Sequence, residues 1–173
     1  MKRLLVMRHA KSDWHAGAAT DHERPLNRRG VEAARTMGIV VAQIGEIPEV
    51  VVTSSAVRAR RTVELAAEAG EWASEIMVDR TLYGTSPQGA LAVIIRASQD
   101  VDRLMVVGHQ PAWGGLVHEL TGASLQMKTA TIAIIDFATE GSWRGRNTIS
   151  GELVAVLQPR HFTESGWAAP ATE

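Results

Sequence analysis

The sequence predicts an α/β fold: a three-layer α/β/α sandwich around a mainly parallel sheet with an antiparallel edge. Short apolar runs alternate along the chain with longer segments whose apolar residues recur at three- and four-residue steps. Such alternation builds parallel strands joined by right-handed helical crossovers. Towards the end of the chain, two apolar runs are separated only by glycine-containing polar sequence, which indicates an antiparallel pair.

The first strand is predicted at residues 2–7, an apolar run too short for a typical helix. The polar and aromatic stretch 11–27 follows as a loop that is longer than the usual connection of about 4–6 residues. A helix is predicted over 28–45, capped by Asn27, because its apolar residues form one stripe: Val31, Ala34, Met37, Val41 and Ile44. Residues 49–53 then form a β-branched second strand.

Serine residues precede two further predicted helices and are expected to cap them. Ser54-Ser55 precedes a helix over 56–69 that carries Arg58 in its first turn. Ser86-Pro87 opens another helix, with proline at its first position. Its buried side is expected to hold Leu91, Ile94 and Ile95, and a short strand is predicted at 76–79 before it.

The last third of the chain contains three more predicted strands, at 103–107, 129–137 and 152–157. Gly108-His109-Gln110-Pro111 turns from the first of these into a helix with an apolar stripe formed by Trp113, Leu116, Val117 and Leu120. Gly141, Gly145 and Gly151 lie between the other two. We predict one domain over 1–158 and a C-terminal tail over 159–173 that frays.

Composition restricts the classes of function. The chain has 173 residues, a net charge of -1 and a pI of about 6.6, which argues against a nucleic-acid partner. It has no cysteine, so disulfides and thiolate metal sites are excluded and a reducing cytosol is allowed. No apolar run reaches about 18 residues and no signal peptide is recognisable, so we expect a cytoplasmic protein without a membrane partner.

Cationic and imidazole side chains follow three of the predicted strands. Arg8 and His9 come after the first strand, Arg58 follows the second, and His109 follows the strand at 103–107. Ligands of open α/β sheets bind at the carboxyl ends of strands, so these residues are expected to meet there. Guanidinium groups bind two oxygens of a phosphoryl group at once, and a neutral imidazole is a nucleophile. The pattern predicts a site for a tetrahedral oxyanion without a metal ion.

Three segments resemble motifs of the histidine phosphatase superfamily, in the small branch of SixA-type phosphohistidine phosphatases. Arg8-His9-Ala10 is similar to its Arg-His-Gly signature. Residues 54–59, with Thr62, resemble its Ser-Pro-Leu-x-Arg-Ala segment, and residues 106–111 resemble its Gly-His-x-Pro segment. A fourth stretch, from Asp21 through Arg24-Pro25-Leu26 to Gly30, looks like the loop that opens the first helix in this branch. The resemblance covers residues 3–120.

The resemblance implies a phosphoglycerate mutase-like fold and a phosphohistidine intermediate on His9. Arg8, Arg58 and His109 would hold the phosphoryl group, so these four are the predicted catalytic residues. Arg24 and Ser54 are the predicted substrate-binding residues, although a loop arginine equally pairs with a local acid such as Asp21. No cofactor is implied. Ala10 replaces the usual glycine and disfavours a positive φ, which affects the expected shape of the loop.

A missing carboxylate favours cleavage of a P–N bond. Members of the resembled family that act on phosphate esters share a carboxylic acid that protonates the leaving oxygen, near the segment that corresponds to Leu82-Tyr83-Gly84. In this chain, residues 80–99 contain no Asp or Glu. An alkoxide needs a general acid to leave, whereas imidazole leaves phosphohistidine after protonation by solvent. Arg58 and His109 are only 51 positions apart, which leaves little room for a lid and suits a phosphorylated side chain of another protein.

Two other functions remain open from the sequence. One is a phosphomonoesterase for small phosphorylated metabolites that recruits Asp79 or Asp13 as its acid. The other is a non-catalytic phosphate-binding module. Because His9 must be neutral to attack, activity is expected to fall on the acid side of neutrality, near the ordinary histidine pKa of about 6.5.

Overall fold

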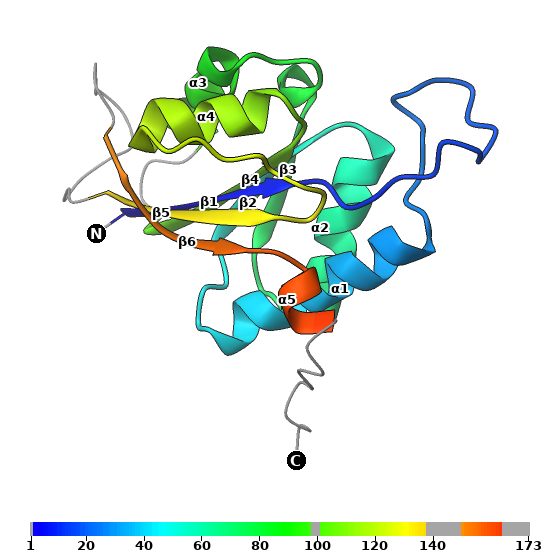
Figure 1. Cartoon of the computed structure of the whole chain (residues 1–173), viewed down its shortest axis with the longest axis horizontal. Helices are drawn as coiled ribbons and strands as arrows, with labels where there is room; N and C mark the ends of the chain where they lie inside the picture. Colours follow the sequence, from blue (N-terminus) through cyan, green and yellow to red (C-terminus); the bar gives the residue numbers. More distant parts are fainter. Residues whose placement is uncertain (1, 98–100, 138–149, 164–173) are drawn as a thin grey trace.

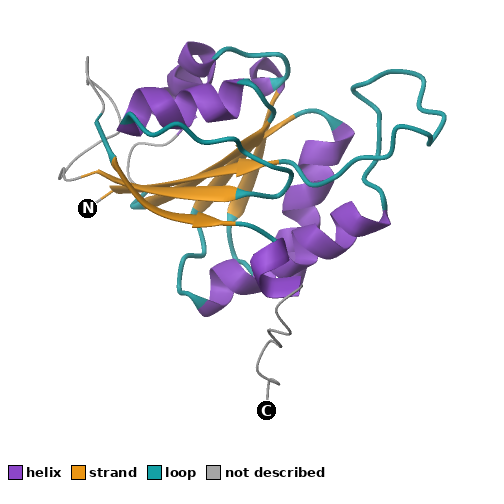
Figure 2. Cartoon of the chain, viewed as in Figure 1, coloured by secondary structure: helices purple, strands orange, loops and turns teal. Residues whose placement is uncertain are grey.

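The computed structural model describes residues 2–97, 101–137 and 150–163, which form one six-stranded sheet covered by helices (Figures 1 and 2). The strands are β1 (Lys2–Arg8), β2 (Val50–Ser54), β3 (Glu75–Asp79), β4 (Arg103–Gly108), β5 (Ile132–Phe137) and β6 (Glu152–Leu157). The helices are α1 (Arg28–Gln43), α2 (Val57–Ala69), the 3-10 turn η1 (Arg80–Leu82), α3 (Pro87–Ala97), α4 (Ala112–Thr121) and α5 (Arg160–Thr163).

The strand order is β3-β2-β4-β1-β5-β6. The first four strands run parallel, whereas β5 is antiparallel to both β1 and β6. This confirms the predicted mainly parallel sheet with an antiparallel edge. Because β2, β4 and β1 are neighbours, their carboxyl ends lie side by side at one edge of the sheet.

Helices cover both faces of the sheet and form the predicted three layers (Figure 2). Alternate residues of β1 face opposite sides, as the pleat of a strand requires. Leu4 and Val6 pack in the core beneath α3 and α4, while Leu5 and Met7 pack in the core beneath α1 and α2. All four are fully buried, so β1 is held rigidly where it enters the site.

Two of the predicted helix caps are confirmed and one is wrong. Asn27 Oδ1 accepts from Gly30 N at 2.9 Å, and Ser86 Oγ accepts from Gly89 N at 3.1 Å. The N-cap of α2 is Ala56, which makes no side-chain cap. The expected serine cap fails because Ser54 still belongs to β2 and its hydroxyl is hydrogen-bonded to His109.

The structure departs from the sequence prediction at three further places. β5 begins at Ile132, because Ala130 has a left-handed φ of 57° that ends the extended conformation. The buried residues of α3 are Ala90, Val93 and Ile94, so the helix is rotated slightly from the predicted face. The short helix α5 lies within the predicted tail. Gly141 and Gly145 fall outside the described residues, and no helix in the described ranges is long and apolar enough to span a membrane.

Candidate active site

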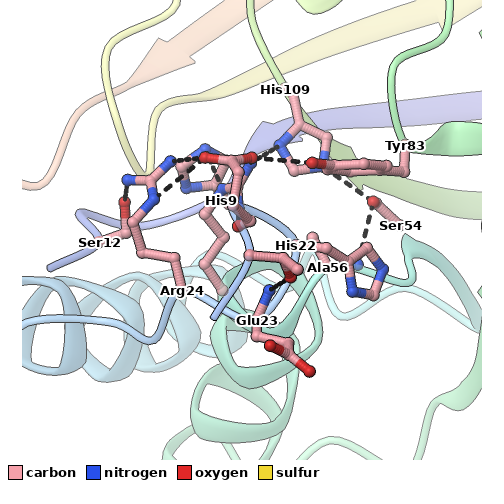
Figure 3. A network of polar contacts seen from close by, with 12 residues as sticks. His9, Ser12, His22, Glu23, Arg24, Ser54, Ala56, Tyr83 and His109 are labelled. Atoms are coloured by element: carbon pink, nitrogen blue, oxygen red, sulfur yellow. Dashed lines mark hydrogen bonds and ion pairs between the residues drawn. The ribbon is translucent and has the colours of Figure 1, made fainter. Parts of the chain in front are cut away.

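The carboxyl ends of β1, β2 and β4 bring together two histidines and an arginine from distant parts of the chain (Figure 3). The ring centroids of His9 and His109 are 5.0 Å apart. Arg58, in the first turn of α2, lies between them: its Nε is 3.3 Å from His9 Nε2 and its Nη2 is 3.4 Å from His109 Nδ1. The structure therefore makes one cluster of residues that are up to a hundred positions apart.

His9 presents an unprotonated nitrogen to this cluster. Its Nδ1 lies 2.7 Å from the Ala10 carbonyl oxygen, which only accepts, so Nδ1 carries the proton. Nε2 then holds the lone pair, to which Arg58 donates. Burial, together with the charges of His109, Arg58 and Arg8, lowers the pKa of His9 to about 3 against the opposing effect of the Ala10 hydrogen bond. The imidazole is neutral at physiological pH.

Backbone contacts hold the His9 segment in place from two sides. Ala10 N donates to Thr62 Oγ1 at 2.9 Å, and the same hydroxyl donates to the Arg58 carbonyl at 2.7 Å. On the other side, Ala130 N lies 3.1 Å from the carbonyl oxygens of both Arg8 and His9. A non-glycine residue with positive φ is costly, and such strain often accompanies functional sites. Ala10 itself has no positive φ, so its departure from glycine causes no strain there.

His109 is oriented from behind by Ser54. Because Arg58 donates to Nδ1, the ring proton lies on Nε2, which donates to Ser54 Oγ at 2.8 Å. Burial and the Arg58 charge lower the pKa of His109 to about 4. Ser54 has no exposed surface, so in this structure it contacts His109 and not the pocket. A Cβ on Gly108 would overlap the ring of Trp113, which explains the glycine before His109.

The two other predicted arginines lie in the same place. Arg8 donates through Nη1 to the Met127 carbonyl at 2.8 Å, and burial together with the Arg58 charge lowers its pKa. Arg24 is 8% exposed and stacks over the Trp14 ring at 3.6 Å. Together with His9, these arginines line a pocket of about 400 Å³, whose remaining lining residues are Lys11, Ser12, Trp14, Lys128 and Thr129. We call it the His9 pocket.

Asp21 is a member of the site, whereas the sequence predicts it only as part of the loop that opens the first helix and as a local partner of Arg24. Its Oδ2 accepts from Arg58 Nη2 at 3.0 Å and from the Tyr83 hydroxyl at 2.9 Å, and its Oδ1 accepts from Arg24 Nη2 at 2.8 Å. Burial alone would raise the pKa of Asp21, but the hydrogen bonds from Arg24 and Tyr83 and the Arg58 charge lower it to about 2. The ionised carboxylate is therefore hydrogen-bonded to Arg58 and Arg24, the arginines that a phosphoryl group would bind.

The two carboxylates that the sequence offered as general acids are bonded elsewhere. Asp79 accepts from the backbone and hydroxyl of Thr81 and from Arg96 Nη2 at 2.6 Å. Asp13 accepts from the backbone N of His15 at 2.8 Å. No hydrogen bond in the described residues joins either carboxylate to His9, Arg58 or His109. Asp21 is therefore the acidic side chain that reaches the described cluster.

Comparisons with known proteins identify the family and the fold. The family model of the histidine phosphatase superfamily (branch 1) matches residues 4–83. An uncharacterised protein of Mycobacterium tuberculosis is 34% identical over 164 residues, which cover 89% of this chain and 100% of that protein. The candidate phosphohistidine phosphatase SixA of Nakamurella multipartitia, a solved structure, is 27% identical, with a TM-score of 0.80 over 91% of this chain and 96% of that one.

More distant structures share the fold with different substrates. The protein histidine phosphatase SixA in complex with tungstate has a TM-score of 0.73 at 23% identity, over 92% of this chain and 99% of that one. A mycobacterial glucosyl-3-phosphoglycerate phosphatase has a TM-score of 0.65 at 15% identity, over 90% and 98%. The architecture is thus the phosphoglycerate mutase-like fold, and the family model together with the SixA-like neighbour identifies a phosphatase. The chain belongs to the histidine phosphatase superfamily.

Asp21→Asn is expected to tighten the binding of inorganic tungstate about tenfold, because the anion no longer displaces a carboxylate from Arg58 and Arg24. Titration calorimetry or competitive inhibition measures the effect. Asp13→Asn, in the same loop, is the control and should leave tungstate affinity within about twofold. Weaker binding by Asp21→Asn would show that Asp21 mainly positions Arg58.

Activity is expected to persist to a lower pH than the sequence suggests. His9 and His109, with pKa values of about 3 and 4, stay neutral in the free protein until the pH falls through those values. The acid limb of kcat/KM, which reports the free enzyme, should therefore lie below pH 5. Rates need correction for enzyme-free hydrolysis and for ionisation of the substrate. A corrected limb centred near 6.5 would contradict the neutral, buried imidazoles.

Proposed function

We propose that the protein is a metal-independent phosphohistidine phosphatase that acts on a phosphorylated protein through a phosphohistidine intermediate on His9. The observation that supports this most directly is the unprotonated Nε2 of a buried, neutral His9 held against Arg58 and beside His109. Arg8, Arg58 and His109 would bind the phosphoryl oxygens, and Arg24 would join them at the mouth of the His9 pocket. We place this activity in the cytoplasm.

In the first proposed step, the lone pair of His9 Nε2 attacks phosphorus and the P–N bond to the substrate imidazole breaks. The leaving nitrogen takes a proton from solvent. In the second step, water attacks the phosphorus on His9, the bond between phosphorus and Nε2 breaks, and inorganic phosphate leaves. The attacking water gives its proton to solvent or to the departing phosphate, and His9 returns to its neutral form. The arginines supply the positive charge that stabilises both transition states, so no resident metal ion is needed for the chemistry.

Departure of Asp21 from the arginines would accompany substrate binding. Within the described chain, Arg58 makes four polar contacts: to His9, to His109, to the Asp21 carbonyl at 2.6 Å and to the Asp21 carboxylate. A phosphoryl dianion near His109 would raise the pKa of that ring and let it donate to a phosphoryl oxygen. The sequence predicts a substrate-binding role for Ser54. Because its hydroxyl is hydrogen-bonded to His109 Nε2, we propose instead that Ser54 orients the His109 ring.

Selectivity for a P–N bond follows from the protonation state of the site. An ester substrate releases an alkoxide, which needs a proton donor close to the leaving oxygen. Asp21 is ionised at neutral pH, and Asp79 and Asp13 are bonded elsewhere. Phosphohistidine has no such need, because its leaving group is an imidazole that solvent can protonate.

Hydrolysis of small phosphorylated metabolites is the second candidate function. A pocket of about 560 Å³ lies beside Tyr83 and includes Arg60 and Arg80, which suit a metabolite with a second anionic group. Asp21, once released from the arginines, would be the acid in that reaction. This replaces Asp79 and Asp13 in the alternative that the sequence offered.

One enzyme preparation, assayed with EDTA present, separates these functions. We expect kcat/KM for free phosphohistidine to exceed that for sugar phosphates and other alkyl phosphates, whose alkoxides need an acid to leave, by at least about a hundredfold. The reverse order, together with loss of ester turnover in Asp21→Asn, would establish the phosphomonoesterase. Tight tungstate binding without hydrolysis of any substrate would identify a phosphate-binding module instead.

A further inference from the structure

A second hollow, continuous with the His9 pocket, carries unpaired positive charge. It has a volume of about 540 Å³ and is lined by residues from the first turns of α1, from helix α5 and from the segment before β5. Helices α1 and α5 are neighbours in Figure 1. Four of its lining residues are cations: Lys11, Arg29, Lys128 and Arg160. We call it the cationic groove. It shares Lys11, Lys128 and Thr129 with the His9 pocket, so the two form one surface.

The charges of the cationic groove are not neutralised by the described residues around it. Glu32 is the one carboxylate among the described lining residues. It accepts a hydrogen bond from Arg28 Nε at 3.0 Å, and Arg28 is not one of the four cations. No ion pair in the described chain uses Lys11, Arg29, Lys128 or Arg160, and all four are exposed. The whole chain has a net charge of -1, so the positive charge of the cationic groove is a local feature and does not follow from the overall composition.

We propose that the cationic groove binds an acidic segment of the protein substrate, next to the phosphohistidine whose phosphoryl group enters the His9 pocket. The inference rests on the proposed function and adds the feature by which the substrate protein is recognised. A free phosphohistidine is too small to occupy both hollows, whereas the chain that flanks a phosphorylated side chain extends into the neighbouring one. Complementary charge in such a position raises the association rate and gives specificity.

Three substrates and two charge reversals test the proposal. The substrates are free phosphohistidine and two phosphohistidine peptides of equal length, one flanked by glutamates and one by glutamines. Arg29→Glu and Arg160→Glu alter the groove without touching the His9 pocket. Arg35→Glu is the matched control, because Arg35 is an exposed residue of α1 that does not line the groove.

For the unmodified protein at low salt, we expect kcat/KM for the glutamate peptide to exceed that for the glutamine peptide about tenfold. The ratio should approach one in about 0.5 M NaCl, since exposed charges are screened. The double variant should lose the preference and keep turnover of free phosphohistidine within about twofold. Arg35→Glu should keep both.

Several results would overturn the inference. A glutamate preference that is absent, or that Arg35→Glu removes equally, would show that the groove selects nothing. Stronger inhibition by an oligothymidylate than by polyglutamate would show that the groove favours nucleic acid. Hydrolysis of free phosphohistidine without any preference between the two peptides would refute the role of the cationic groove and leave the proposed function intact. Failure to hydrolyse all three substrates would refute the proposed function itself.

Discussion

Replacement of His9 by alanine is expected to lower phosphohistidine turnover at least about ten-thousandfold, because it removes the nucleophile. Neither a cysteine thiol, which the chain lacks, nor the Ser54 hydroxyl, which has no exposed surface, can attack the phosphoryl group in place of His9. Steady-state kcat/KM on free phosphohistidine measures the loss. His118→Ala, which changes an exposed histidine of α4, should leave turnover within about twofold. An alanine variant of His9 with full activity would contradict the assignment.

The covalent step has its own signature. Rapid acid-free quenching of the enzyme with labelled phosphohistidine should trap a phosphoenzyme that is labile in acid and stable in alkali, as expected for a P–N bond. The His9→Ala variant should trap none. An acid-stable phosphoenzyme would point to a serine or threonine ester, and Ser12 and Thr129 are the hydroxyl residues that line the His9 pocket. Thermal unfolding of the variant, compared with the unmodified protein, controls for a loss of folded structure.

The cluster of His9, Arg58 and His109 was predictable from sequence because its members occupy equivalent positions in the fold. Each comes just after a strand, and the strands β1, β2 and β4 are recognisable as apolar, β-branched runs. Parallel pairing then places their carboxyl ends together, whatever the length of the connections between them. The resemblance to a known family adds the roles of these residues but is not needed to bring them together.

The participation of Asp21 was not predictable in the same way. It lies in the long loop between β1 and α1, where neither apolar periodicity nor strand order fixes the position of a side chain. Its contacts with Arg58 and Tyr83 join three separate segments. An isolated bridge from Ser12 to Leu26 closes the base of the loop, and the stacking of Arg24 on Trp14 orders its interior. These are tertiary interactions between irregular segments.

The segment before β5 was also missed, for a different reason. Residues 129–131 are apolar or β-branched and extend the strand pattern, so the sequence predicts that they belong to the strand. In the structure, Ala130 adopts a left-handed φ and its N–H faces the carbonyls of Arg8 and His9. Met127 binds Arg8 from the same segment. A strained alanine leaves no trace in composition, because glycine or asparagine is what such a conformation normally selects.

Arg58→Lys is expected to lower kcat/KM about a hundred- to a thousandfold, although it conserves the charge. Arg58 is 5% exposed and uses Nε, Nη1 and Nη2 at once to reach His9, His109 and the backbone of Asp21. A lysine ammonium group cannot reproduce the planar set of N–H donors of a guanidinium, and it cannot bind two phosphoryl oxygens through two parallel hydrogen bonds. Arg58→Ala should lose more activity, because the positive charge is also absent from the transition state.

The two variants differ in pH dependence, which separates loss of charge from loss of geometry. The Arg58 charge lowers the pKa of both His9 and His109. Its removal in Arg58→Ala should shift the acid limb of kcat/KM to higher pH, whereas Arg58→Lys should leave the limb near that of the unmodified protein. Arg61→Ala is the control, since Arg61 lies on the same helix and pairs with Glu64 on the surface at 3.1 Å. Equal shifts in Arg58→Ala and Arg61→Ala, with none in Arg58→Lys, would mean that the limb reports the net charge of the protein and not the site. An Arg58→Lys enzyme with full activity would show that the planar guanidinium is dispensable.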